Sequence, residues 1–217
     1  VDGASKLYDA LRIDHFRAFE SYWAVPRGAE SAKQGQWRPG PGMDLVGRLT
    51  AWFNNVQFIA EDLGVLTPGV HKLLSDSGLP GMKVLEFAFD PASLSDYLPH
   101  RYIENCICYA GTHDNNTLRG WIDEENPETL AFVREYLGID GEADLADAVL
   151  RAGMRSKAEL FIAQMQDWLG LAADARMNTP GTVGGNWAWR MTPGSATKAL
   201  AGKMRRMAYI YGRSDKE

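Results

Sequence analysis

Three short stretches of the chain combine an acidic side chain with Arg, His or Asn, each directly after an apolar run. They are RID at 12–14, IAED at 59–62 and THDN at 112–115. Cleaving a glycosidic bond with retention needs two carboxyl groups: a neutral one protonates the leaving oxygen, and an ionised one attacks the anomeric carbon. Taken singly each stretch is weak, because acidic residues at strand ends are often helix N-caps.

The three stretches differ in the role that their neighbours favour. Arg12 and Asp14 are two apart, so in a strand both side chains point to one face, an arrangement that suits a carboxylate that must stay ionised. Glu61 follows an apolar run, which suits a general acid. His113 and Asp114 are placed to hold neighbouring sugar hydroxyls.

Five apolar runs are predicted to supply the strands that position these groups. They are 10–19, 55–64, 81–90, 106–115 and 158–170. Strands that alternate with helices imply a parallel sheet covered on both faces. Periodicity alone leaves a barrel and a doubly wound sheet open. Acidic residues after three of the runs favour a (β/α)₈ barrel, whose catalytic groups lie at the C-terminal strand ends.

The segments between these runs carry weaker signals. A helix is expected from Pro68 to Ser77, and the Pro/Gly-rich segment 36–45 is expected to be a loop, neither helix nor central strand. The Glu-, Asp- and Ala-rich stretch at about 123–157 is predicted to be an exposed helical insertion.

Composition excludes several classes of protein. The 217 residues are 45% hydrophobic with a net charge of −5 and no basic stripe, which argues against nucleic-acid binding. No apolar run approaches the roughly 18–20 residues of a membrane span.

Cys106 and Cys108 lie two apart in a strand-like run. They are expected to be buried thiols in a reducing compartment, by default the cytoplasm. No metal-ligand cluster or cofactor motif is found, so we expect no cofactor.

Six signatures in the same order resemble those of the 4-α-glucanotransferases, also called amylomaltases or disproportionating enzymes. These enzymes form glycoside hydrolase family 77 of the α-amylase superfamily. The signatures are RIDHFRAF, IAEDLGVLTPGV, PGMKVLEFAF, YAGTHDNNT, ARMNTPGT and GNWAWR, colinear from about Leu7 to Arg190. The resemblance implies retaining transfer of α-1,4-glucan segments between maltooligosaccharides or glucans, with no metal.

The resemblance also assigns roles to particular residues. Asp14 resembles the catalytic nucleophile with Arg12 as its partner, and Glu61 resembles the general acid/base. Asp114 resembles the third carboxylate, which holds and distorts the sugar in subsite −1, and His113 its hydroxyl-binding neighbour.

Two further positions fall where the family binds substrate. Phe87 matches an aromatic residue near the donor sugars, although core packing explains it equally well. Asn178 matches a residue on a loop at the rim of the site, although a turn role explains it equally well. Ala18 and Asn116 depart from the usual Gly and Asp, and Asn116 removes a charge near the site.

The resemblance covers the C-terminal part of such a barrel, about strands four to eight. It implies several hundred preceding residues with strands one to three, and therefore either self-association or pairing with that N-terminal half. Two other functions remain open: an α-amylase-like hydrolase, and a catalytically silent glucan-binding fragment.

Overall fold

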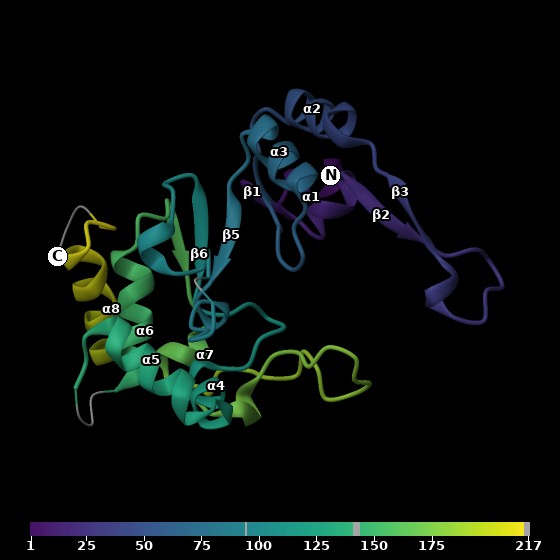
Figure 1. Cartoon of the computed structure of the whole chain (residues 1–217). Coiled ribbons are helices and arrows are strands. Elements are labelled where there is room, and N and C mark those ends of the chain that lie inside the picture. Colours follow the sequence, from purple (N-terminus) through teal and green to yellow (C-terminus); the bar gives the residue numbers. More distant parts are fainter. Residues whose placement is uncertain (94, 141–143, 215–217) are drawn as a thin grey trace. The chain divides into compact units, whose positions relative to one another are not determined.

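The computed structural model describes residues 1–93, 95–140 and 144–214. The chain divides into two compact units, an N-terminal unit of residues 1–82 and a C-terminal unit of residues 83–217 (Figure 1). It is a mixed α/β protein, as the sequence predicts.

The N-terminal unit is built on two parallel strands. Its elements are α1 (Asp2–Ser5), β1 (Ala10–Ile13), η1 (Phe16–Phe19), β2 (Ser21–Ala24), η2 (Ala32–Gln34), β3 (Gln36–Pro39), α2 (Gly42–Trp52), β4 (Gln57–Ala60) and α3 (Pro68–Ser77). Strands β1 and β4 pair in parallel, with Ile13 opposite Ala60 at their C-terminal ends. Phe16, Val46 and Leu73 form a buried cluster with Ala60, so η1, α2 and α3 all anchor the end of β4.

Helix α3 spans the residues that the sequence predicts. Thr67 is its N-cap, and the Thr67 side chain accepts a hydrogen bond from the Val70 amide at 3.3 Å. Pro68 occupies the first turn, where its missing N–H has no intrahelical partner to lose. Local capping chemistry therefore fixes where this helix begins.

The prediction that 36–45 is a loop is wrong. Gln36–Pro39 forms β3, which pairs antiparallel with β2 and places Trp37 opposite Trp23. Pro39 is tolerated because it ends a strand of a two-stranded hairpin. Helix α2 begins at Gly42, directly after Pro41 in the N-cap position, so the prolines precede the helix instead of interrupting it.

The C-terminal unit contains a three-stranded sheet in the order β5–β6–β7, whose first strand begins at the boundary between the units. Its strands and short helices are β5 (Gly81–Val84), η3 (Leu85–Phe87), η4 (Pro99–Arg101), β6 (Cys106–Tyr109), β7 (Leu160–Ile162) and η5 (Ala173–Ala175). Strands β6 and β7 are parallel, with Tyr109 opposite Ile162. All five apolar runs thus contain a strand.

Helices form the remainder of this unit. They are α4 (Leu118–Glu124), α5 (Pro127–Leu137), α6 (Leu145–Arg155), α7 (Met165–Trp168) and α8 (Lys198–Ile210). Helix α6 contacts α4, α5 and α8, and α8 lies beside α6 in Figure 1. Val149 and Leu150 of α6 are buried in the largest core cluster together with Cys108 of β6.

The stretch 123–157 contains helices, but the expectation that it is exposed is wrong for one face. Leu145, Val149 and Leu150 of α6 are at most 4% exposed, because this face covers the core of the unit. Residues 141–143 of the stretch lie outside the described residues. Its status as an insertion in a barrel stays a prediction.

The two cysteines are buried free thiols, as expected. Burial raises the pKa of Cys108 to about 12. Among the described residues, no helix combines the length and apolar character needed to cross a bilayer.

Gly81, the first residue of β5, is required because it lies directly against Asp62, which follows β4. The buried Asp62 carboxylate accepts a hydrogen bond from the Met82 amide at 2.6 Å, and a Cβ on Gly81 would lie 2.7 Å from Asp62 Oδ2. We expect Gly81→Ala to lower the free energy of unfolding by about 1–3 kcal/mol, because the buried hydrogen bond is displaced. Urea denaturation measures this.

Gly47→Ala is the matched control for that substitution. Gly47 lies inside α2, and a Cβ there meets no atom within 4 Å. Helix propensity predicts that this change stabilises the protein by up to about 1 kcal/mol. Equal effects of the two substitutions would contradict the role given to the Gly81–Asp62 contact.

Candidate active site

Asp14 and Glu61 directly follow the paired ends of β1 and β4. The hydrogen-bond ladder continues past the strands, because the Glu61 amide donates to the Ile13 carbonyl and the Phe16 amide donates to the Glu61 carbonyl, both at 2.9 Å. The two acidic residues therefore occupy the C-terminal ends of neighbouring parallel strands, as the sequence predicts. In α/β enzymes this edge of the sheet carries the chemistry.

Both oxygens of the Glu61 carboxyl group are held by backbone amides. Oε2 accepts from the His15 amide at 2.6 Å, and Oε1 accepts from the Leu63 amide at 3.0 Å. His15 has φ 49° and ψ 49°, a left-handed conformation that non-glycine residues adopt rarely. This turn directs the His15 amide at Glu61, so the loop that carries Asp14 also fixes the orientation of Glu61.

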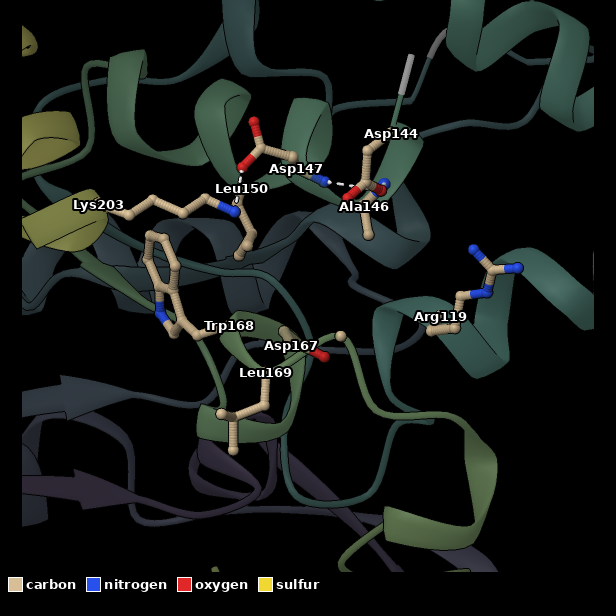
Figure 2. A pocket seen from close by; sticks show the side chains of 10 residues that line it. Arg119, Asp144, Ala146, Asp147, Leu150, Asp167, Trp168, Leu169 and Lys203 are labelled. Atoms are coloured by element: carbon tan, nitrogen blue, oxygen red, sulfur yellow. Dashed lines mark hydrogen bonds and ion pairs between the residues drawn. The ribbon is translucent and has the colours of Figure 1, made fainter. Parts of the chain in front are cut away.

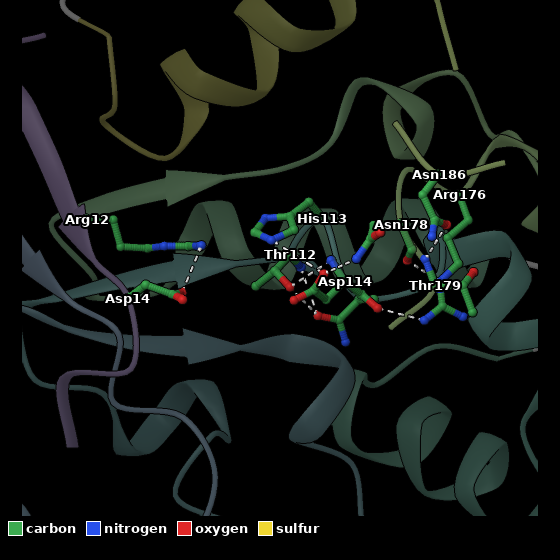
Figure 3. Close-up of polar contacts among 10 residues, drawn as sticks. Arg12, Asp14, Thr112, His113, Asp114, Arg176, Asn178, Thr179 and Asn186 are labelled. Atoms are coloured by element: carbon green, nitrogen blue, oxygen red, sulfur yellow. Dashed lines mark hydrogen bonds and ion pairs between the residues drawn. The ribbon is translucent and has the colours of Figure 1, made fainter. Parts of the chain in front are cut away.

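Asp14 itself is open to solvent. Its side chain is 83% exposed, and Arg12 Nη2 lies 3.7 Å from Asp14 Oδ1, so the expected Arg–Asp pair is present (Figure 3). The Arg12 side chain is only 25% exposed, so the surrounding protein holds the cationic partner of this pair in place. The carboxylate is thus oriented and still accessible, as a nucleophile must be.

The third predicted carboxylate, Asp114, lies in the C-terminal unit in a dense polar network. Asn178 Nδ2 donates to Asp114 Oδ1 at 2.6 Å, and His113 Nε2 lies 3.4 Å from the same oxygen. Arg176 Nη2 donates to the Asp114 backbone carbonyl at 2.6 Å (Figure 3). Three of the predicted residues, His113, Asp114 and Asn178, are therefore brought together.

The turn that presents Asp114 is closed by Asn115. The Asn115 side-chain oxygen accepts from both the amide and the hydroxyl of Thr112, at 3.0 and 2.8 Å. The Thr112 hydroxyl oxygen in turn accepts from the Asp114 amide at 3.3 Å. These bonds fix the backbone on both sides of Asp114.

Arg176 and Trp187 complete this network, and neither is assigned a role in the sequence analysis. Arg176 Nε donates to the Asn178 carbonyl at 2.9 Å, and the Trp187 amide donates to the Met177 carbonyl at 2.7 Å. The Trp187 ring lies 5.1 Å from the His113 ring, centroid to centroid. Both residues belong to the quoted ARMNTPGT and GNWAWR signatures, but only the folded chain shows that they contact the THDN turn.

Phe87 is on the surface, which disfavours the core-packing interpretation. Its side chain is 45% exposed, and its ring meets the Tyr97 ring edge-on at 5.9 Å. Asn116, by contrast, is buried, and its Oδ1 accepts from the Thr117 amide at 2.8 Å.

Two carboxyl groups near the THDN turn, the buried Asp167 and the partly buried Glu86, escaped the sequence analysis. Burial raises the pKa of Glu86 to about 8, with the nearby Asp167 as the second cause. Burial likewise raises the pKa of Asp167 to about 6. Asp167 Oδ1 accepts from the Leu118 amide at 2.8 Å and so holds the first turn of α4. No local pattern marks either residue, since the apolar sequence around Glu86 predicts only a strand.

A polar cavity of about 250 Å³ lies beside Asp167. Lys203, Asp147 and Arg119 also line it, and Lys203 pairs with Asp147 at 2.7 Å (Figure 2). Within the described part of the chain, no three His, Cys, Asp or Glu side chains are grouped to hold a metal ion.

Comparison with known proteins agrees with the sequence signatures. A family model described as 4-alpha-glucanotransferase matches residues 1–197. The chloroplastic/amyloplastic 4-alpha-glucanotransferase of Arabidopsis thaliana is 43% identical over 97% of this chain and 37% of its own length. The 4-alpha-glucanotransferase of Clostridium butyricum is 42% identical over 99% of this chain and 44% of its own length.

Solved structures show the same partial overlap. The amylomaltase of Streptococcus agalactiae, solved with acarbose, is 37% identical with a TM-score of 0.93 over 99% of this chain and 44% of that one. The amylomaltase of Corynebacterium glutamicum, at 19% identity and a TM-score of 0.72, shares the fold. The chain thus spans less than half the length of these relatives.

Proposed function

The chain belongs to the 4-alpha-glucanotransferase family, and from this premise we propose that it carries the catalytic carboxyl groups of an enzyme that transfers α-1,4-glucan segments between maltooligosaccharides or glucans. The observation that carries the proposal is the pairing of β1 with β4, which brings Asp14 and Glu61 to adjacent strand ends. No cofactor is needed for this chemistry.

In the proposed reaction, the Asp14 carboxylate attacks C1 of a bound glucose unit while Glu61 donates its proton to the departing O4. The C1–O4 bond breaks, and the reducing-end fragment leaves. Glu61 then removes the proton from the 4-hydroxyl of an acceptor glucan, whose oxygen attacks C1 and breaks the ester to Asp14. Retaining chemistry of this kind calls for a carboxyl separation of about 5–5.5 Å between Asp14 and Glu61.

The remaining predicted residues have binding roles in this proposal. Arg12 forms an ion pair with Asp14, and Asp114 with His113 binds hydroxyls of the sugar in subsite −1. The hydrogen bond from Asn178 to Asp114 supports a role for Asn178 in orienting that carboxylate. The exposure of Phe87 supports contact with a sugar face.

The proposed architecture is the C-terminal part of a (β/α)₈ barrel, with β1, β4, β5, β6 and β7 as strands four to eight. The parallel pairs β1–β4 and β6–β7 support this assignment. The helices between residues 123 and 157 would then be an insertion after the seventh strand of the barrel. We further propose a cytoplasmic location, supported by the two free thiols.

Product analysis with maltotriose tests the function in the natural full-length protein. Transfer gives glucose together with maltopentaose and longer chains, whereas an α-amylase-like hydrolase gives only sugars shorter than the substrate. A catalytically silent glucan-binding protein leaves maltotriose unchanged and still binds acarbose. Either of these last two results would overturn the proposal.

The 217-residue chain alone is expected to self-associate and to show little transfer activity. It spans 37–44% of the length of its relatives, and in the described part of the chain β1 pairs with β4 alone, so the other edge of β1 can pair further. Light scattering coupled to size exclusion, with a maltotriose assay on the eluted peak, measures both properties. A monodisperse, active monomer would contradict this expectation.

A further inference from the structure

The Glu86 carboxyl group lies against the backbone that leads into the THDN turn. A Cβ on Gly111 would lie 2.6 Å from Glu86 Oε1 and 3.1 Å from the Asn115 Cβ, so only glycine permits this approach. Glu86 Oε1 is fully buried and has no hydrogen-bond partner among the residues that the structure describes. The Glu86 amide donates to the Ala110 carbonyl at 3.3 Å, which ties η3 to the end of β6.

Asn115 connects Glu86 with the turn. The Asn115 side-chain oxygen is engaged by two donors from Thr112, so its NH₂ group is the part left to face Glu86, and Asn115 is one of the causes that oppose the raised pKa of Glu86. Thr112 also accepts from the Asp114 amide. Glu86 and Asn115 thus pack together around Gly111, and the hydrogen bonds of Asn115 and Thr112 continue from there to the backbone of Asp114.

The charged groups around Glu86 decide its protonation. Burial is the largest cause that raises its pKa to about 8, the charge of Asp167 on α7 is the second, and Glu124 on α4 adds to them. The Asn115 hydrogen bond and the positive charge of Arg176 oppose this shift. At neutral pH the Glu86 side chain is therefore an uncharged acid.

We propose that Glu86 is a positioning residue for Asp114: its side chain packs against Gly111 and Asn115 and thereby sets the Thr112–Asn115 turn. When Glu86 ionises, a second negative charge is added to that of Asp167 in a buried site, and the packing under the turn is lost. Catalysis then falls as the pH rises through about 8. This consequence for catalysis rests on the proposed function, whereas the placement of Glu86 does not.

Glu86→Gln is the decisive variant, because glutamine has nearly the same shape and stays neutral. Its side-chain oxygen can still face the NH₂ group of Asn115. In the natural full-length protein we expect kcat/KM for maltotriose disproportionation to stay within about threefold of wild type at pH 6.5, since the geometry is kept. The decline in kcat with an apparent pKa near 8 should be present in the wild type and absent in the variant. Glu128→Gln, at an exposed position in the first turn of α5, is the control and should keep the decline.

Glu86→Ala and Gly111→Ala test the positioning role at a pH where Glu86 is neutral. Each removes or displaces the support under the turn, so we expect kcat to fall at least about tenfold at pH 6.5 with a smaller change in KM, because Asp114 acts mainly in the transition state. If Glu86→Ala keeps wild-type kcat, or if Glu86→Gln keeps the alkaline decline, the proposal is wrong.

A second readout separates this proposal from the proposed function. A raised folded-state pKa means that wild type loses stability relative to Glu86→Gln as the pH rises from about 4.5 to about 8, and the difference stays constant above that range. Urea denaturation of both proteins at several pH values measures it. A constant difference across that range would overturn the proposal, whereas absence of disproportionation by the wild type would count only against the proposed function.

Discussion

Replacing Asp14 by Asn in the natural full-length protein is expected to reduce kcat for glucan transfer by roughly three to five orders of magnitude, because the amide is not a nucleophile. The structure predicts that the fold survives, since the Asp14 side chain is 83% exposed and forms its ion pair with Arg12 at 3.7 Å. Initial rates with maltotriose measure the loss, and circular dichroism with thermal unfolding reports on the fold.

Asp76→Asn is the matched control for this substitution. Asp76 also lies in the N-terminal unit and forms an ion pair with Lys72 at 2.8 Å, within one helix. An exposed helical pair of this kind contributes about 0.3–0.5 kcal/mol, so activity should not change. Comparable rates for Asp14→Asn and wild type would refute the nucleophile assignment.

Replacing Glu61 by Gln is expected to reduce kcat by roughly three orders of magnitude with a sugar leaving group, because the proton donor is lost. The substitution also places an amide NH₂ against a backbone donor, since the His15 and Leu63 amides each donate to one Glu61 oxygen. We therefore expect a loss of about 1–3 kcal/mol in stability as well.

The leaving group separates the lost proton from that structural effect. Fluoride departs without protonation, so the first step with α-glucosyl fluoride should be nearly as fast in Glu61→Gln as in wild type. Stopped-flow release of fluoride measures this step. An equally large loss with both substrates would mean that Glu61 orients the site and does not donate the proton.

The elements that the sequence predicts well are those with local signals. Helix α3 is bounded by Thr67 and Pro68, and Asp14 and Glu61 could be located because each follows a short apolar strand. The loop prediction for 36–45 is wrong because its two prolines lie at the boundary between β3 and α2. Prolines at such a boundary are compatible with a strand before them and a helix after them.

Contacts between distant residues explain what the sequence could not show. Arg176 reaches the Asp114 carbonyl across 62 positions, and Asp167 caps α4 from 49 positions away. Glu86 sits in an apolar run and becomes a partly buried acid with a raised pKa only when Gly111 and Asn115 pack against it. Such roles depend on tertiary packing, which no periodicity in the chain encodes.

The most direct measurement is to trap the covalent glycosyl-enzyme and locate the sugar. 5-Fluoro-α-glucosyl fluoride should glycosylate the protein quickly, because fluoride leaves readily, and release the sugar slowly. Trypsin then separates the three predicted carboxylates, since Asp14 lies in the peptide 13–17, Glu61 in 49–72 and Asp114 in 102–119. We expect the added mass on peptide 13–17, where Asp14 is the single acidic side chain. A label on either other peptide, or rapid fluoride release with no labelled peptide, would contradict the assignment of Asp14 as the nucleophile of a retaining glucanotransferase.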